Sequence, residues 1–202
     1  MKRAIVLSGT VLLSCCFLTT LANGRSFAKK KHLYAQIDVG MTSEDWQDFK
    51  KLPAQWGFSQ AGHSGVSFGG LLGMQLYKHL SVEAGGDFLP KAEYSLDKKQ
   101  YDIAQSLFYL AGRLTARFSN TMELYTRLGL AYRHLDNSQD AVGSGDVTGP
   151  FMGLGVDYRF SRVLLVGAAY SHEPGDFTSD KLSNLSPNLN IFALTATYQF
   201  AS

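Results

Sequence analysis

Residues 122–133, MELYTRLGLAYR, alternate between two kinds of side chain. The apolar positions are Met122, Leu124, Leu128 and Leu130, and the charged positions between them are Glu123, Arg127 and Arg133. Successive side chains of a β-strand point to opposite faces, whereas an α-helix repeats its apolar positions every three or four residues. The segment therefore predicts a strand with one apolar face and one polar face.

The same alternation recurs along the chain and predicts eight strands. They lie near residues 32–42, 65–77, 80–89, 102–118, 121–135, 149–160, 162–172 and 190–200. Tight turns at Lys78-His79, Ser119-Asn120 and Ser161-Arg162 alternate with long polar connections at 43–64, 90–101, 136–148 and 173–189. This plan predicts an all-β fold, an eight-stranded antiparallel up-and-down transmembrane β-barrel with short periplasmic turns and long extracellular loops.

The composition of the two faces predicts which of them points inward. The apolar face of the strands has no charged residue, whereas the other face combines glycines with balanced charges. Those charges are Arg113, Arg117, Arg127, Arg133 and Arg159 against Asp38, Glu83, Asp87, Glu123 and Asp157. Balanced charges suit a crowded interior in which each ion has a partner. A secreted lipocalin-type barrel, with the faces reversed, is the alternative.

Aromatic residues near the strand ends predict two girdles at the membrane interfaces. They are Tyr34, Tyr77, Phe88, Phe118, Tyr158, Phe160, Tyr170, Tyr198 and Phe200.

The N-terminal residues have the pattern of a cleaved secretory signal peptide. Lys2 and Arg3 precede an uncharged apolar run, and small residues follow it. We expect a signal peptide at 1–28 and a barrel domain at 29–202, with cleavage after Ala28 or, alternatively, Ala22. The apolar run is also long enough to be a membrane anchor, which remains an alternative.

Composition excludes several classes of protein. Removing residues 1–28 takes away three basic residues and no acid, so the formal net charge changes from +2 to −1. This balance gives no reason to expect nucleic-acid binding. Both cysteines, Cys15 and Cys16, lie in the apolar leader, so no disulfide is expected in the exported chain.

Three stretches resemble the N-terminal transmembrane domain of the OmpA family. They are the segment 122–133, Gly149-Pro-Phe-Met-Gly-Leu-Gly-Val-Asp-Tyr158 and Ser81-Val-Glu-Ala-Gly-Gly-Asp87. The final Thr195-Ala-Thr-Tyr-Gln-Phe200 resembles the terminal signal read by the barrel-insertion machinery. The resemblance implies a polar, largely blocked lumen with an ion network. Its members would be Glu83, Arg113, Arg127 and Asp157.

Two departures from the family pattern concern that network. Gly167 stands where the family has a base, and Ala169 stands where it has a nearby acid. We therefore expect a smaller or rearranged network. We also expect no peptidoglycan-binding domain after the barrel.

The network has two readings, a structural plug that holds the barrel in shape or a gate that opens when ion pairs exchange. No catalytic arrangement emerges from the sequence. Adjacent residues of a strand face opposite sides, so Ser171-His172-Glu173 cannot form a triad among themselves. The histidines show no metal-ligand spacing, and no cofactor is expected. The first long loop contains an aromatic group, Trp46, Phe49, Trp56 and Phe58, that is a candidate contact surface.

We therefore expect a non-enzymatic structural barrel of a Gram-negative outer membrane. It would contact membrane lipid and lipopolysaccharide, display four surface loops and allow at most weak porin-like passage of small solutes. A lipid A-modifying barrel enzyme and a surface adhesin with a host ligand remain alternatives.

Overall fold

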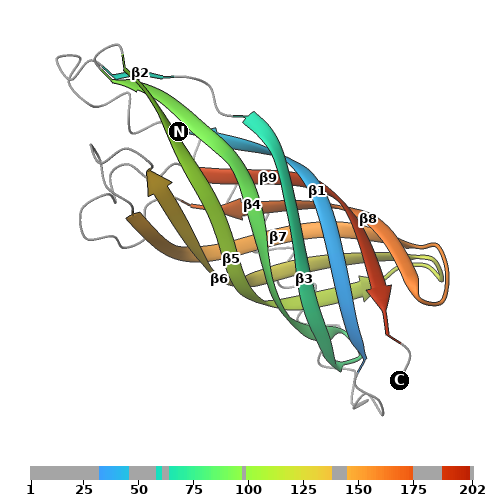
Figure 1. Ribbon diagram of the computed structural model, residues 1–202. Helices are drawn as coiled ribbons and strands as arrows, with labels where there is room; N and C mark the ends of the chain where they lie inside the picture. The colour runs from blue at the N-terminus through green and yellow to red at the C-terminus, as the bar shows by residue number, and fades with distance from the viewer. Residues whose placement is uncertain are drawn as a thin grey trace, which may run out of the picture.

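The computed structural model of the protein describes residues 32–45, 58–60, 64–96, 99–137, 145–174 and 188–200 (Figure 1). The strands are β1 (Leu33–Asp45), β2 (Phe58–Gln60), β3 (Ser64–Tyr77), β4 (Leu80–Leu96), β5 (Lys99–Arg117), β6 (Met122–Asn137), β7 (Gly145–Arg159), β8 (Leu164–Glu173) and β9 (Asn188–Gln199). Within these ranges, no helix is long and apolar enough to cross a membrane. The proposed signal peptide, 1–28, lies outside the described residues.

Eight of the nine strands form a closed antiparallel barrel. Neighbours in sequence pair from β3 to β9, β1 pairs with both β3 and β9, and the β4–β5 pairing completes the circle. Figure 1 shows the closure, with β1 and β9 side by side. Closure pairs every strand on both sides and removes the free edges that an open sheet would expose. The predicted eight-stranded architecture is confirmed.

The extracellular ends of the strands differ from the prediction. The hairpin of β4 and β5 continues to the pair Leu96 and Lys99, so most of the predicted loop 90–101 is strand. The register shifts between Leu89 and Ala92, around Pro90, which has no amide proton to donate to the ladder. β2, inside the predicted loop 43–64, pairs with the outer end of β4. Backbone pairing needs no apolar alternation, so the sequence pattern does not mark these extensions.

The periplasmic turns are short, as predicted, although two are longer than two residues. Lys78 and His79 form the β3–β4 turn, whereas 118–121 and 160–163 form the other two. In each of the longer turns a serine hydroxyl accepts hydrogen bonds from two backbone amides. Ser119 accepts from Thr121 and Met122. Ser161 accepts from Val163 and Leu164. These hydroxyls satisfy amides that would otherwise lack a partner.

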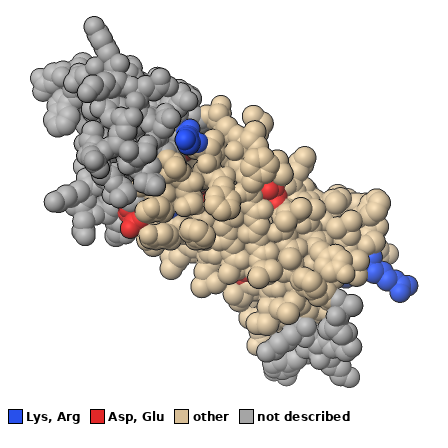
Figure 2. All heavy atoms as spheres, in the orientation of Figure 1, with Lys and Arg blue, Asp and Glu red and all other residues tan. Residues whose placement is uncertain are grey.

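The outer wall of the barrel is apolar. Large hydrophobic side chains on the outward positions are mostly exposed, for example Leu72 at 67% and Leu194 at 73%. Figure 2 shows that the wall between the two ends of the molecule has almost no charged side chains. Most of the charged inward positions of the same strands, such as Glu83, Arg127 and Asp157, are buried instead. This confirms the predicted orientation of the faces and excludes the lipocalin arrangement, in which the apolar face points inward.

The inner face is not only polar, which corrects the prediction. An apolar cluster extends along the lumen on the extracellular side of Glu83, Arg113, Arg127 and Asp157, where the buried Asp38, Asp87, Arg133 and Glu173 also lie. Its larger members include Leu71, Leu107, Tyr109, Phe151, Leu189 and Ile191. The rings of Tyr109 and Phe151 stack with their centroids 4.3 Å apart. An eight-stranded barrel is just wide enough for side chains to fill, so large apolar residues can occupy its interior.

Candidate functional site: a charged network across the lumen

Glu83 of β4 is the centre of a charged network inside the barrel. Its carboxylate is fully buried and accepts hydrogen bonds from two arginines, from Arg127 Nε at 2.6 Å and from Arg113 Nη1 at 3.4 Å. Arg113 and Arg127 form a cross-strand pair on β5 and β6. Glu83 therefore places a negative charge between two neighbouring positive charges and reduces their repulsion.

Asp157 of β7 completes the charge balance. Its Oδ2 accepts from Arg113 Nη2 at 2.6 Å, so Arg113 bridges the two carboxylates. The structure thus brings all four predicted network residues together, two acids with two bases. A neutral group of this kind reduces the cost of burying each ion, because every charge has an opposite charge in contact.

Three uncharged polar residues, which the sequence analysis did not assign to the network, extend it. Tyr34 donates its hydroxyl proton to Glu83 Oε1 at 2.6 Å, and Gln36 Oε1 accepts from Arg127 Nη2 at 2.9 Å. The ring of Tyr125 lies against both guanidinium groups. Its centroid is 3.8 Å from Cζ of Arg113 and 4.7 Å from Cζ of Arg127. Such cation–π contacts stabilise the arginines in a desolvated place.

The position of Tyr34 corrects a prediction. The sequence analysis placed it in an interfacial girdle, but its side chain is buried in the lumen. The sequence did indicate the inward position, because Tyr34, Gln36 and Asp38 are alternate residues of β1 and therefore lie on the same face. Aromatic character near a strand end was a weaker indicator than the alternation itself.

Glycines leave room for the network tyrosines. Tyr34 is paired across strands with Gly73, and Tyr125 with Gly155. At both glycines an added Cβ would overlap the tyrosine ring. The rings therefore lie over bare backbone, as aromatic residues commonly do beside glycine in sheets.

We expect Gly155→Ala to destabilise the barrel by about 1–3 kcal/mol, because the new methyl group overlaps Tyr125 in a packed interior. Urea unfolding in phospholipid vesicles measures the change. Gly112→Ala is the matched control, since the nearest atom to its added Cβ is Leu128 O at 3.9 Å. Equal effects of the two substitutions would contradict this account of Gly155.

Gly167 explains how the network closes without the base expected in its strand. It is paired across strands with Asp157, and an added Cβ would overlap Asp157 Oδ1. The small residue lets the carboxylate lie against the barrel wall, where Arg113 reaches it. The departure from the family pattern thus fits a compact network of two acids and two bases.

A second buried ion pair lies nearer the extracellular end. Arg133 Nε is 3.5 Å from Glu173 Oε2, and both side chains are buried. Glu173 was predicted in a loop but is the last residue of β8. The ring of His172, by contrast, contacts the Asn190 side chain at 2.9 Å. The divergent surroundings of His172 and Glu173 agree with the argument against a triad.

The predicted aromatic loop group has no described side chain. Trp46, Phe49 and Trp56 lie outside the described residues, and Phe58 is described only as the first backbone position of β2. No group of three or more histidine, cysteine, aspartate or glutamate residues suited to a metal ion occurs in the described part of the chain.

A closed antiparallel barrel with an apolar outer wall and buried, paired charges defines a membrane-spanning β-barrel protein. The family model named outer membrane protein beta-barrel domain matches residues 8–200. The chain therefore belongs to this family, and the family implies a bacterial outer membrane.

Solved structures share the fold at low sequence identity. Neisserial surface protein A is 12% identical with a TM-score of 0.61, over 85% of this chain and 100% of that chain. The N-terminal barrel of Pseudomonas aeruginosa OprF is 14% identical with a TM-score of 0.53, over 85% and 100%. OprG of the same organism is 15% identical with a TM-score of 0.52, over 85% and 98%. No curated protein matches the sequence.

Proposed function

We propose that this protein is a structural, closed barrel of OmpA type that maintains the envelope and displays its long loops, and that it is not an enzyme. The observation that carries the proposal is the double closure of the lumen. The neutral charged network crosses the lumen above its periplasmic end, and the apolar cluster around Tyr109 and Phe151 narrows the lumen on the extracellular side of this network. A solute would have to displace both layers.

Conductance across a planar bilayer tests this function. We expect no steady current from the wild-type barrel, and none from Arg113→Ala, because the apolar cluster stays in place when the network is opened. The gel shift on heating, a property of folded outer-membrane barrels, confirms that each sample is folded. A steady wild-type current would favour weak porin-like passage instead. A current that appears only in Arg113→Ala would favour a gate.

The proposed partners follow from the surface. Exposed leucines and phenylalanines along the wall suit lipid chains, with lipopolysaccharide around the outer half. Phe200 follows β9, with its ring exposed and in edge contact with Tyr198. We propose that this end of the chain is recognised by the barrel-insertion machinery. The long loops would carry any contact with a host surface.

A further inference from the structure

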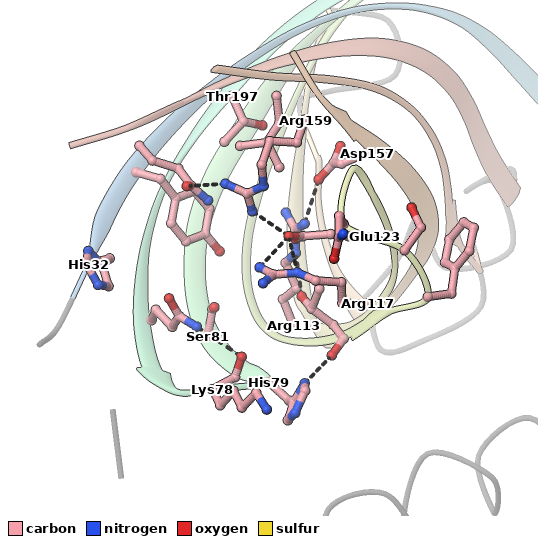
Figure 3. A pocket seen from close by; sticks show the side chains of 18 residues that line it. His32, Lys78, His79, Ser81, Arg113, Arg117, Glu123, Asp157, Arg159 and Thr197 are labelled. Carbon is pink, nitrogen blue, oxygen red and sulfur yellow. Dashed lines mark hydrogen bonds and ion pairs between the residues drawn. The ribbon is translucent and has the colours of Figure 1, made fainter. Parts of the chain in front are cut away.

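A cavity of about 990 Å³ opens at the periplasmic end of the barrel, below the charged network (Figure 3). We call it the periplasmic vestibule. Its charged and histidine lining includes Lys78 and His79 of the β3–β4 turn, Arg117 of β5, Glu123 of β6 and Arg159 of β7. The closed-barrel function leaves this cavity without a role.

Two arginines of the vestibule share one carboxylate oxygen. Arg117 donates to Glu123 Oε1 from Nε at 3.1 Å and from Nη2 at 2.7 Å, and Arg159 donates to the same oxygen from Nη2. Figure 3 shows both guanidinium groups converging on Glu123. One arginine would neutralise this carboxylate, so the second leaves an uncompensated positive charge.

The vestibule as a whole is cationic. Of the described residues that line it, four are lysine or arginine and two are acidic. The second acid, Asp157, is already paired with Arg113. Lys78 therefore adds to the surplus of positive charge at Arg117 and Arg159.

The surplus charge is accessible from the periplasm. The side chain of Arg117 is 57% exposed and that of Arg159 is 23% exposed, whereas Arg113 and Arg127 above them are buried. Planar guanidinium groups bind oxyanions, and phosphate in particular, through two parallel hydrogen bonds. Surplus guanidinium groups that face a cavity are therefore suited to bind an anionic ligand.

We propose that the periplasmic vestibule binds a phosphate group, with Arg117 and Arg159 as its donors and Lys78 as a further countercharge. The phosphate group could come from two sources that meet this end of the barrel. One is free phosphate or a soluble monoester in the periplasm, and the other is the headgroup of a phospholipid of the inner leaflet. Glu123 holds the two arginines in place and competes with the ligand for them.

The test is a titration of the folded barrel in dodecyl maltoside, which contains no phosphate, with inorganic phosphate. The Nε–Hε signals of Arg117 and Arg159 are followed by NMR. We expect saturable shifts of both, and Arg117→Gln should weaken binding about tenfold, since it removes one charged donor. Glu123→Gln should strengthen binding several-fold, because it removes the competing carboxylate. Lys91→Gln, an exposed lysine of β4 towards the opposite end, is the matched control and should change nothing.

A second titration, with dihexanoyl phosphatidylglycerol below its micellar concentration, separates the two sources. Tighter binding of this lipid assigns the site to a headgroup, and tighter binding of inorganic phosphate assigns it to free phosphate. Absence of a saturable shift with both probes overturns the proposal. The proposal is also overturned if neither Arg117→Gln nor Glu123→Gln changes the affinity, or if Lys91→Gln weakens binding as much as Arg117→Gln does. The opposite directions expected for the two vestibule variants distinguish binding from a general loss of structure.

Discussion

Glu83→Gln is expected to lower the free energy of unfolding by about 3–5 kcal/mol, the cost of leaving buried charge without its partner. Glu83 is the carboxylate that Arg113 and Arg127 share, and the substitution removes the ion pair of Arg127 and leaves Arg113 with Asp157. Glutamine keeps the size of the side chain, so the effect reports charge and not a cavity. Urea unfolding in phospholipid vesicles measures it.

Asp146→Asn is the matched control for Glu83→Gln. It makes the same chemical change in an exposed pair with His134, where solvent screens the interaction and the expected cost is small. A second variant separates charge from shape. Adding Arg127→Met to Glu83→Gln restores the balance of one acid and one base, so part of the lost stability should return. A cost of Glu83→Gln no larger than that of Asp146→Asn would refute the role given to the network.

Leu128→Arg is expected to destabilise the barrel in a bilayer by about 2–4 kcal/mol, the cost of a basic residue on the lipid face near the midplane. Leu128 is an outward residue of β6, 57% exposed. It lies six residues from Met122, the periplasmic end of the strand. With a rise of about 3.3 Å per residue along a tilted strand, this places it roughly 15 Å up the wall. Unfolding in vesicles and the fraction of heat-shifted protein both report the loss.

Phe160→Arg is the control for Leu128→Arg. Phe160 is also exposed on the outside, but it lies in the periplasmic turn between β7 and β8. Near an interface the expected cost falls to about 0–1 kcal/mol. Equal costs at the two positions would mean that the wall around Leu128 does not meet hydrocarbon. The comparison therefore tests the membrane assignment with one kind of substitution at two depths.

The sequence predicts the strands and their faces because both depend on local periodicity. A side chain on a β-strand alternates sides whatever its neighbours are, so Leu128 and Arg127 had to face opposite ways. The glycines and the balance of charges on one face then indicated which side is inside. The same reasoning grouped Glu83, Arg113, Arg127 and Asp157, supported by the family resemblance. The same reasoning should also have placed Tyr34 inside, because the alternation along the strand assigns a residue to a face regardless of its type.

The alternation of side chains along a strand assigns each residue to the inner or the outer face. It does not determine which residues of distant strands lie at the same height in the barrel, or how they pack. Only the closed barrel brings Tyr125 between two arginines, places Gly167 beside Asp157 and stacks Tyr109 on Phe151. The same holds for Arg117 and Arg159, whose convergence on Glu123 depends on the geometry of the rim. Alternation along the chain thus determined the wall of this protein. The register and curvature of the closed sheet decided what fills it, because contacts across a lumen depend on strand stagger, which the local sequence does not encode.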